Sequence, residues 1–173
     1  EDYEKIKVLS KDLRKKIMLG DCADIESIYG IYVKRYEERY SDVKKYIDMK
    51  HNFTVDEYIE FKKETDYLDE ASVKEKWRKR IKYQFLQLKN AIKDEKKVLD
   101  KLKKRFELSH LRLKEYTTND VYGFYLKSFA MSIDPHSSYF PPEELSDFRI
   151  QTKLSLFGIG AVLNSEDGVV VVR

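Results

Sequence analysis

The distribution of proline constrains this chain most strongly. All three prolines (Pro135, Pro141 and Pro142) lie in the last quarter of the 173 residues, so the first 133 residues contain none. Because proline breaks helix interiors, this long segment is free to form long helices. Three of the six glycines also lie late in the chain, in the final sixteen residues. The sequence therefore divides into two pieces that meet near residue 134.

The first piece has the period of amphipathic helices. From Ile25 to Ile47, apolar side chains recur every three or four residues with charged residues between them, which predicts one long helix. A similar stripe predicts a helix over about residues 2–18. Between the two, Gly20 and Asp21 predict a helix stop followed by an N-cap.

Further helix starts are indicated by capping signals. The segments Thr54-Val-Asp-Glu57 and Ser72-Val-Lys-Glu75 both match the capping box. The second one opens an apolar stripe that runs from Trp77 to Phe106. A last helix is expected over about 119–132, with Val121, Phe124, Tyr125 and Phe129 along it. Residues 1–133 are thus predicted to form a helical domain of five or six helices.

The second piece changes character at Asp134-Pro135, because proline disfavours helical backbone in the residue before it. Asp-Pro-His-Ser suits a type I turn, and Pro141-Pro142-Glu143-Glu144 suits the start of a short helix, so 134–150 is predicted to be a linker. Leu154–Leu163 and Val169–Val172 are rich in β-formers and predict a hairpin with its turn at 164–168. Two strands alone are marginally stable, so 151–173 is expected to begin a larger β domain.

Composition excludes several classes of protein. The chain is 42% hydrophobic and 13% aromatic, which excludes wholesale disorder, and no stretch approaches the roughly 18 apolar residues of a membrane-spanning helix. The single cysteine, Cys22, excludes an intrachain disulfide and a cysteine-based zinc site. His51 and His110 stand alone without ligand spacing. We expect no metal and no cofactor.

Two segments in the right order resemble a known family. Ile133-Asp-Pro-His-Ser-Ser-Tyr139, followed by Leu154-Ser-Leu-Phe-Gly-Ile-Gly-Ala-Val-Leu163, is similar to the carboxy-terminal processing (tail-specific) proteases. Upstream, Lys34–Tyr40 and Glu75–Arg80 are similar to the helical region of the Gram-negative periplasmic branch. The resemblance implies a serine peptidase with a Ser/Lys dyad and an embedded PDZ domain. It also implies an exported, periplasmic protein, near the inner membrane and peripheral to it at most.

The resemblance places a substrate-binding loop in the glycine-containing segment. Successive backbone N–H groups of a Gly-x-Gly can hold a peptide carboxylate while the peptide adds as a strand. In this interpretation the loop receives a substrate's C-terminal tail, and Ile159 and Val162 line a pocket for its last side chain. The family often has an acidic residue where this chain has Phe157. The alternative is a glycine-kinked strand at a sheet corner. The candidate substrate-binding residues are Phe157, Gly158, Ile159, Gly160 and Val162.

No catalytic residue is assigned to this chain. In the family, the serine and lysine lie downstream of the PDZ domain, so the fragment itself is expected to be inactive. His136 beside Ser137 and Ser138 is interpreted as a polar turn, because adjacent residues cannot form a triad.

Charge is distributed unevenly along the chain. Residues 74–105 contain fourteen Lys and Arg against four acids, a local net charge of +10 in a chain of net +3. Such a segment can bind nucleic acid or an anionic membrane, but no nucleic-acid motif accompanies it, and we interpret it as solvated helix faces. The tyrosine-rich stripe at 29–46 is interpreted as core packing, with a surface for a protein partner as the alternative.

Two functional hypotheses follow. The first takes the chain as the N-terminal fragment of a tail-specific serine endopeptidase that recognises unstructured, apolar C-termini. The second takes it as a complete, non-enzymatic helical module that binds another protein. The second predicts that residues 150–173 fold by themselves, and the unsupported hairpin argues against it.

Overall fold

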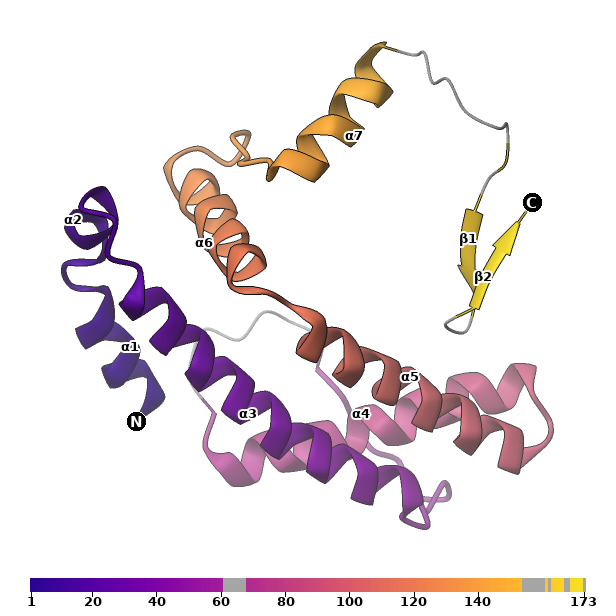
Figure 1. Ribbon diagram of the computed structural model, residues 1–173. Helices are drawn as coiled ribbons and strands as arrows, with labels where there is room; N and C mark the ends of the chain where they lie inside the picture. Colours follow the sequence, from indigo (N-terminus) through magenta and orange to yellow (C-terminus); the bar gives the residue numbers. More distant parts are fainter. Residues whose placement is uncertain (61–67, 154–160, 162, 167–168, 173) are drawn as a thin grey trace. The chain divides into compact units, whose positions relative to one another are not determined.

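The computed structural model describes residues 1–60, 68–153, 161, 163–166 and 169–172. In these residues the chain forms seven helices and one two-stranded antiparallel hairpin (Figure 1), which confirms the predicted helical array followed by a β hairpin. Six of the helices in these described residues precede Asp134, and five or six were expected. The helices are α1 (Asp2–Ser10), α2 (Leu13–Met18), α3 (Ala23–Asp48), α4 (Glu70–Ala91), α5 (Glu95–Glu115), α6 (Thr118–Ile133) and α7 (Pro142–Lys153). None of the described helices has the length and apolarity needed to cross a membrane.

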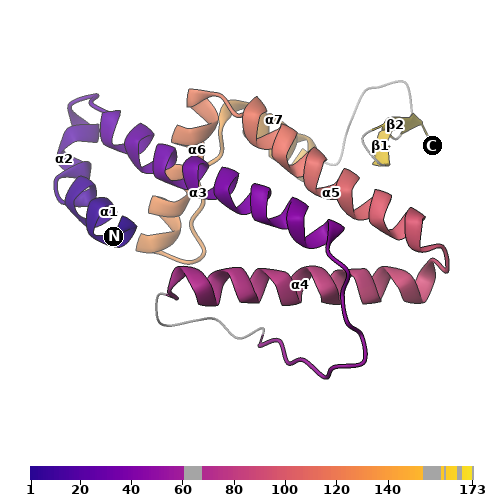
Figure 2. The same ribbon diagram turned by 90° about the horizontal axis from the view of Figure 1, so that it is seen from below.

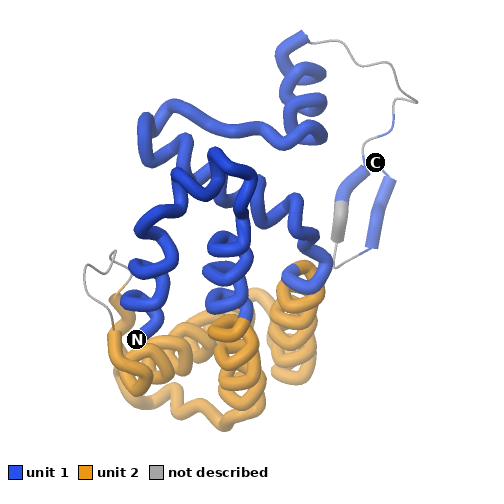
Figure 3. Tube along the Cα trace, turned by 60° about the vertical axis from the view of Figure 1, so that its left-hand side comes forward, with its two compact units in different colours: residues 1–33, 113–173 blue, residues 34–112 orange. Residues whose placement is uncertain are grey.

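The chain forms two compact units, which are coloured separately in Figure 3. Unit 1 contains Glu1–Val33 and Leu113–Arg173, and unit 2 contains Lys34–Arg112. Helices α3 and α5 each contribute residues to both units.

Unit 2 is built around one apolar core from three helices, the second half of α3 with α4 and α5 (Figure 2). Each helix contributes side chains one turn apart, because residues i and i+4 lie on the same helix face. Trp77, Leu88 and Phe106, which the sequence assigned to the same stripe, pack against this core. The buried members are Val43, Ile47, Ile81, Phe85, Val98 and Leu102.

Unit 1 has a smaller core. Leu13 of α2, Ile25 of α3 and Val121 of α6 are buried against one another. The partly buried residues packed against them are Ile17, Cys22, Ile28, Tyr29, Tyr122 and Tyr125. The Tyr122 hydroxyl donates a 2.5 Å hydrogen bond to the Glu26 carboxylate, which ties α6 to α3.

The N-terminal segment corrects one prediction. Residues 2–18 form two helices, not one, because Asp12 has φ −116° and ψ 15° and so leaves the helical path. After α2, Gly20 confirms the predicted stop. It has φ +79°, and the N–H groups of Gly20 and Asp21 donate to the carbonyls of Ile17 and Lys16, as in a Schellman motif. The predicted N-cap at Asp21 is wrong by one residue, because α3 begins at Ala23 and the carbonyl of Cys22 accepts the Glu26 N–H of its first turn. The Asp21 carboxylate accepts the Ala23 N–H.

Both predicted capping boxes are wrong. Thr54 begins no helix, and its N–H and hydroxyl both donate to the Asn52 side chain. Glu57 instead pairs with two cations of α4. Helix α4 begins before Ser72, because Asp69 is the true N-cap and accepts the Ser72 N–H at 2.7 Å.

Helix α6 ends where the sequence predicts, with Asp134 as its C-cap. The Ser137 N–H donates to the Asp134 carbonyl and closes the predicted turn. Pro142 is the first residue of α7, as expected, although this helix runs on to Lys153 and so beyond the predicted linker. Gly123 of α6 lies close to Pro141: a Cβ added to this glycine would lie 3.3 Å from the proline ring.

The hairpin pairs β1 (Leu163–Glu166) with β2 (Val169–Val172), with Leu163 opposite Val172 and Glu166 opposite Val169. Residues 164–166, which were predicted to belong to the turn, are therefore part of a strand. The greater part of the predicted first strand, 154–160 and 162, lies outside the described residues.

Candidate functional site

The predicted substrate-binding loop is not among the described residues. Phe157, Gly158, Ile159, Gly160 and Val162 all lie outside the described ranges, so their roles stay predictions. The nearest described features are Ala161 and the hairpin that follows it.

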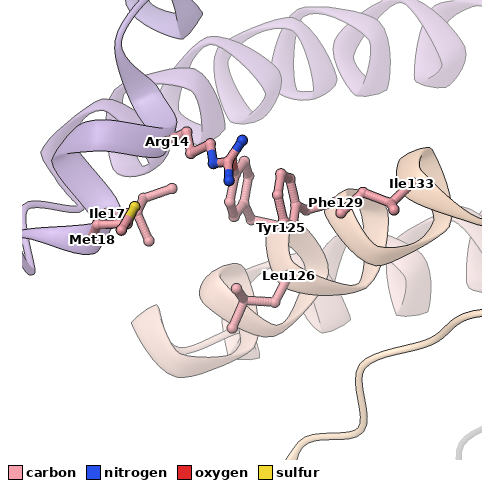
Figure 4. A pocket seen from close by; sticks show the side chains of 7 residues that line it. All are labelled: Arg14, Ile17, Met18, Tyr125, Leu126, Phe129 and Ile133. Carbon is pink, nitrogen blue, oxygen red and sulfur yellow. The ribbon is translucent and has the colours of Figure 1, made fainter.

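The described part of unit 1 contains a different candidate site, an open pocket of about 420 Å³ between α2 and α6. Figure 4 shows Arg14, Ile17 and Met18 of α2 on one side of it and Tyr125, Phe129 and Ile133 of α6 on the other. The α6 residues are four apart, so they form one continuous stripe along that helix. Leu126 completes the lining.

Among the described residues that line the pocket, Arg14 is the only one with a charged side chain, and the others are aliphatic or aromatic. Its guanidinium extends over the pocket beside the ring of Tyr125 (Figure 4). Within the described part of the chain, Arg14 forms no ion pair with any carboxylate. The pocket therefore offers an apolar surface with a single cation at its edge.

The floor of this pocket belongs to the unit 1 core. Ile17 and Tyr125 are half-buried and pack against the buried cluster of Leu13, Ile25 and Val121. Burial raises the pKa of Tyr125, and its ring stacks on that of Phe129 with 6.3 Å between centroids. Core packing thus fixes the floor.

The lip of the pocket is solvent-exposed. Met18 and Ile133 are 79% and 72% exposed, and Phe129 is also exposed. Exposed apolar side chains that surround a cavity are a common sign of a binding surface.

The Asp134-Pro-His-Ser segment immediately follows this lip. The Asp134 carboxylate accepts the His136 N–H at 3.2 Å and the Ser137 hydroxyl at 2.8 Å. The Ser137 hydrogen bond, followed by that of His136, lowers the pKa of Asp134. The side chain of His136 is exposed, and its Nδ1 lies 3.4 Å from Asp134. The segment therefore holds the end of α6, and in this exposed turn His136 and Ser137 both face Asp134, as expected of a polar turn.

The basic segment of unit 2 is partly neutralised by tertiary ion pairs. The Glu57 carboxylate forms ion pairs with both Arg78 and Lys82 of α4. The Asp48 carboxylate forms one with Lys103 of α5, at 2.6 Å. The hydrogen bond from Arg78, followed by that from Lys82, lowers the pKa of Glu57 to about 2. These tertiary pairs involve three of the fourteen Lys and Arg side chains of the segment, and its interpretation as solvated helix faces stays a prediction.

The two isolated histidines take structural positions in unit 2. His110 lies 2.7 Å from the Glu37 carboxylate and stacks on Tyr40 with 4.0 Å between ring centroids. His51 donates from Nε2 to the Tyr46 carbonyl, and burial lowers the pKa of its imidazole. No group of three or more potential metal ligands was found among residues that the structure describes.

Sequence reasoning did not identify the pocket. The sequence predicts Tyr125 and Phe129 along one helix without distinguishing their roles, and of these two only Tyr125 packs against the buried cluster. The sequence did not single out Arg14, because its neighbours Lys15 and Lys16 are also positively charged. A weak clue was available in α6, since Ile133 and Met131 extend its apolar character past the predicted stripe.

Comparison with known proteins adds two findings. Residues 1–143 match the family described as the tail-specific protease N-terminal domain. The chain is also 32% identical over 163 residues to the tail-specific protease of Haemophilus influenzae. That alignment covers 93% of this chain and 24% of the relative, so the chain spans about a quarter of the length of the relative that it matches. The family match covers the whole α2–α6 pocket.

Proposed function

Because this chain belongs to the tail-specific protease family, we propose that it is the N-terminal part of an endopeptidase that recognises the C-terminal tails of other proteins. The observation that carries this proposal is the family match over residues 1–143, together with 32% identity to a protein named tail-specific protease. The tails would be unstructured and apolar at their ends.

We assign tail recognition to the PDZ-like segment that follows α7. In this proposal Phe157, Gly158, Ile159 and Gly160 receive the terminal carboxylate on backbone N–H groups, and Val162 helps Ile159 to line the pocket for the last side chain. The tail adds to the sheet as a strand. Binding energy from this remote contact selects the substrate before any bond is cleaved.

The chemistry itself is proposed to lie outside this chain. A serine would attack the scissile carbonyl and a lysine would act as its general base, both in a part of the protease that these 173 residues do not include. The helical residues then serve to shape or gate substrate entry. We place the protein in the periplasm, at most peripheral to the membrane, with substrate tails and a protein on the helical domain as partners, and without nucleic acid.

The proposal is tested with the complete natural protein. An unstructured substrate ending in apolar residues is compared with the same substrate carrying a C-terminal amide or two terminal Asp residues. The free apolar tail should be degraded at least tenfold faster than either control. Equal rates for the three substrates would contradict tail recognition, and peptidase activity in the pure 173-residue chain would contradict the location of the catalytic residues.

A further inference from the structure

We propose that the α2–α6 pocket is a second binding site for a free, apolar C-terminus, with the terminal carboxylate on Arg14. The last apolar side chain would lie between Met18 of α2 and the Phe129–Ile133 face of α6. This site is separate in sequence from the PDZ-like segment to which the proposed function assigns tail recognition. The pocket itself indicates an apolar ligand with one negative charge. The inference rests on the proposed function only in taking this ligand to be the C-terminus of a polypeptide.

The charge pattern of the pocket points to this ligand. An apolar lining interrupted by one guanidinium fits a molecule that is apolar over most of its length and carries one negative charge. The guanidinium donates to both oxygens of a carboxylate in one plane, and such charge-assisted pairs are stronger than neutral hydrogen bonds. Since no described acid neutralises Arg14, the cation is available to a ligand.

The size and rigidity of the pocket agree with a chain end. About 420 Å³ lies in the range of small-ligand sites, enough for a few apolar groups and too little for a folded domain. The floor is fixed because Ile17 and Tyr125 pack on the unit 1 core. At the lip, Met18 is flexible and exposed, so it can adapt to different last side chains.

The exposed end of α6 supplies the remaining contact area. Ile133 is the last residue of α6, and the Asp134 turn holds the helix end through the His136 N–H and the Ser137 hydroxyl. An apolar tail that covers Met18 and Ile133 would remove from water two side chains that are now more than 70% exposed. That burial favours an apolar over a polar tail.

The experiment measures binding of a fluorescein-labelled nonapeptide that ends in Leu-Leu to the 173-residue chain by fluorescence anisotropy. The free-acid peptide should bind at least tenfold more tightly than its C-terminal amide. Arg14→Gln should weaken the free acid about tenfold and leave the amide unchanged, and Arg14→Lys should restore part of the loss. Lys15→Gln is the matched control. It also removes one positive charge from α2, but Lys15, the neighbour of Arg14, does not line the pocket. It should change affinity less than twofold.

A photo-cross-linking residue at the penultimate position of the same peptide locates the site. Adducts are expected on α2 or α6, with Met18 a principal target, and at a peptide concentration below the Kd their yield should fall about tenfold in Arg14→Gln. Adducts confined to 154–173, with normal affinity in Arg14→Gln, would overturn this inference and leave the proposed function standing. Equal binding of acid and amide, or no binding by the chain, would also overturn it.

Two further outcomes separate the inference from its alternatives. If laurate binds in an Arg14-dependent manner and the free-acid peptide does not, the pocket holds a lipid and the inference is wrong. If the peptide binds through Arg14 but the complete protein degrades amidated and free-acid substrates equally, the inference stands and the proposed function fails.

Discussion

The ammonium of Lys82 lies 2.5 Å from the carboxylate of Glu57, and Lys82 is only 6% exposed. This residue of α4 also donates to the Val55 carbonyl, so the segment after α3 is fixed to α4 through one buried cation. Arg78, one turn earlier on α4, bonds the same carboxylate.

Glu57→Gln is expected to destabilise the chain by about 2 kcal/mol at pH 7, because it leaves a nearly buried ammonium without its acid. The pKa of Glu57 is lowered from 4.5 to about 2, so its stabilising effect is complete above pH 4.5 and is lost as pH falls towards 2. Urea unfolding between pH 2 and pH 7 should show this loss in the natural sequence and a flatter profile in the variant. Parallel profiles would contradict the pairing.

Tyr122→Phe tests the hydrogen bond that joins α6 to α3 in unit 1. The bond to the Glu26 carboxylate raises the pKa of Tyr122 to about 12, so the folded state holds this proton more tightly than the unfolded state. Stability should therefore fall as pH rises from 10 to 12, and Tyr122→Phe should remove this dependence. Unfolding measured at several alkaline pH values gives the slope, with Tyr58→Phe, at an exposed position, as the control that should change nothing.

Two glycines in helices should respond oppositely to alanine. Gly30 of α3 has open space around it, so Gly30→Ala should stabilise the chain by about 1 kcal/mol through helix propensity. At Gly123 the new methyl group would lie 3.3 Å from the rigid Pro141 ring. In Gly123→Ala this contact should cancel the gain in helix propensity. The free energy of unfolding of Gly123→Ala should therefore be at least about 1 kcal/mol lower than that of Gly30→Ala. Equal thermal shifts in the two variants would show that Pro141 does not pack on α6.

Leu102→Ala should destabilise unit 2 by about 3 kcal/mol, because a fully buried side chain is replaced by a cavity. The single tryptophan, Trp77, packs against this core, so its fluorescence reports the unfolding of unit 2. On the same helix, Leu111 is 49% exposed, and Leu111→Ala should change stability by less than about 0.5 kcal/mol. Similar midpoints for the two variants would contradict the described core.

Asp134→Ala should release the turn at the end of α6. The variant removes the acceptor of the His136 N–H, so hydrogen exchange at His136 should become several-fold faster. Asp134→Asn retains an acceptor oxygen and should change the exchange rate much less. Equal exchange in Asp134→Ala and the natural chain would show that the carboxylate does not hold this turn.

Local sequence signals predicted the features that depend on neighbouring residues. The end of α6 at Asp134 follows from Pro135, and the break after α2 follows from the left-handed backbone that Gly20 permits. The stripes of α3, α4 and α5 predicted the unit 2 core, because each helix must bury its apolar face.

Local signals failed where a side chain had a distant partner. Thr54-Val-Asp-Glu57 has the composition of a capping box, but the Glu57 carboxylate is used by cations of α4 more than twenty residues away. The break at Asp12 was also missed, because the apolar period continues across it.

The sequence by itself determined the helical class and the positions of the main helix stops, since these depend on residue types within a turn or two. It also indicated the family, through two segments in the right order. Only the tertiary structure decided which apolar side chains of α6 pack on the unit 1 core and which stay exposed at the lip of the pocket. Tyr125 and Phe129 have the same period and similar chemistry, and they differ because only Tyr125 contacts the unit 1 core. The tertiary structure also distinguished Arg14 from Lys15, because only Arg14 lines the pocket. The two sides of that pocket come from residues more than a hundred positions apart in the sequence.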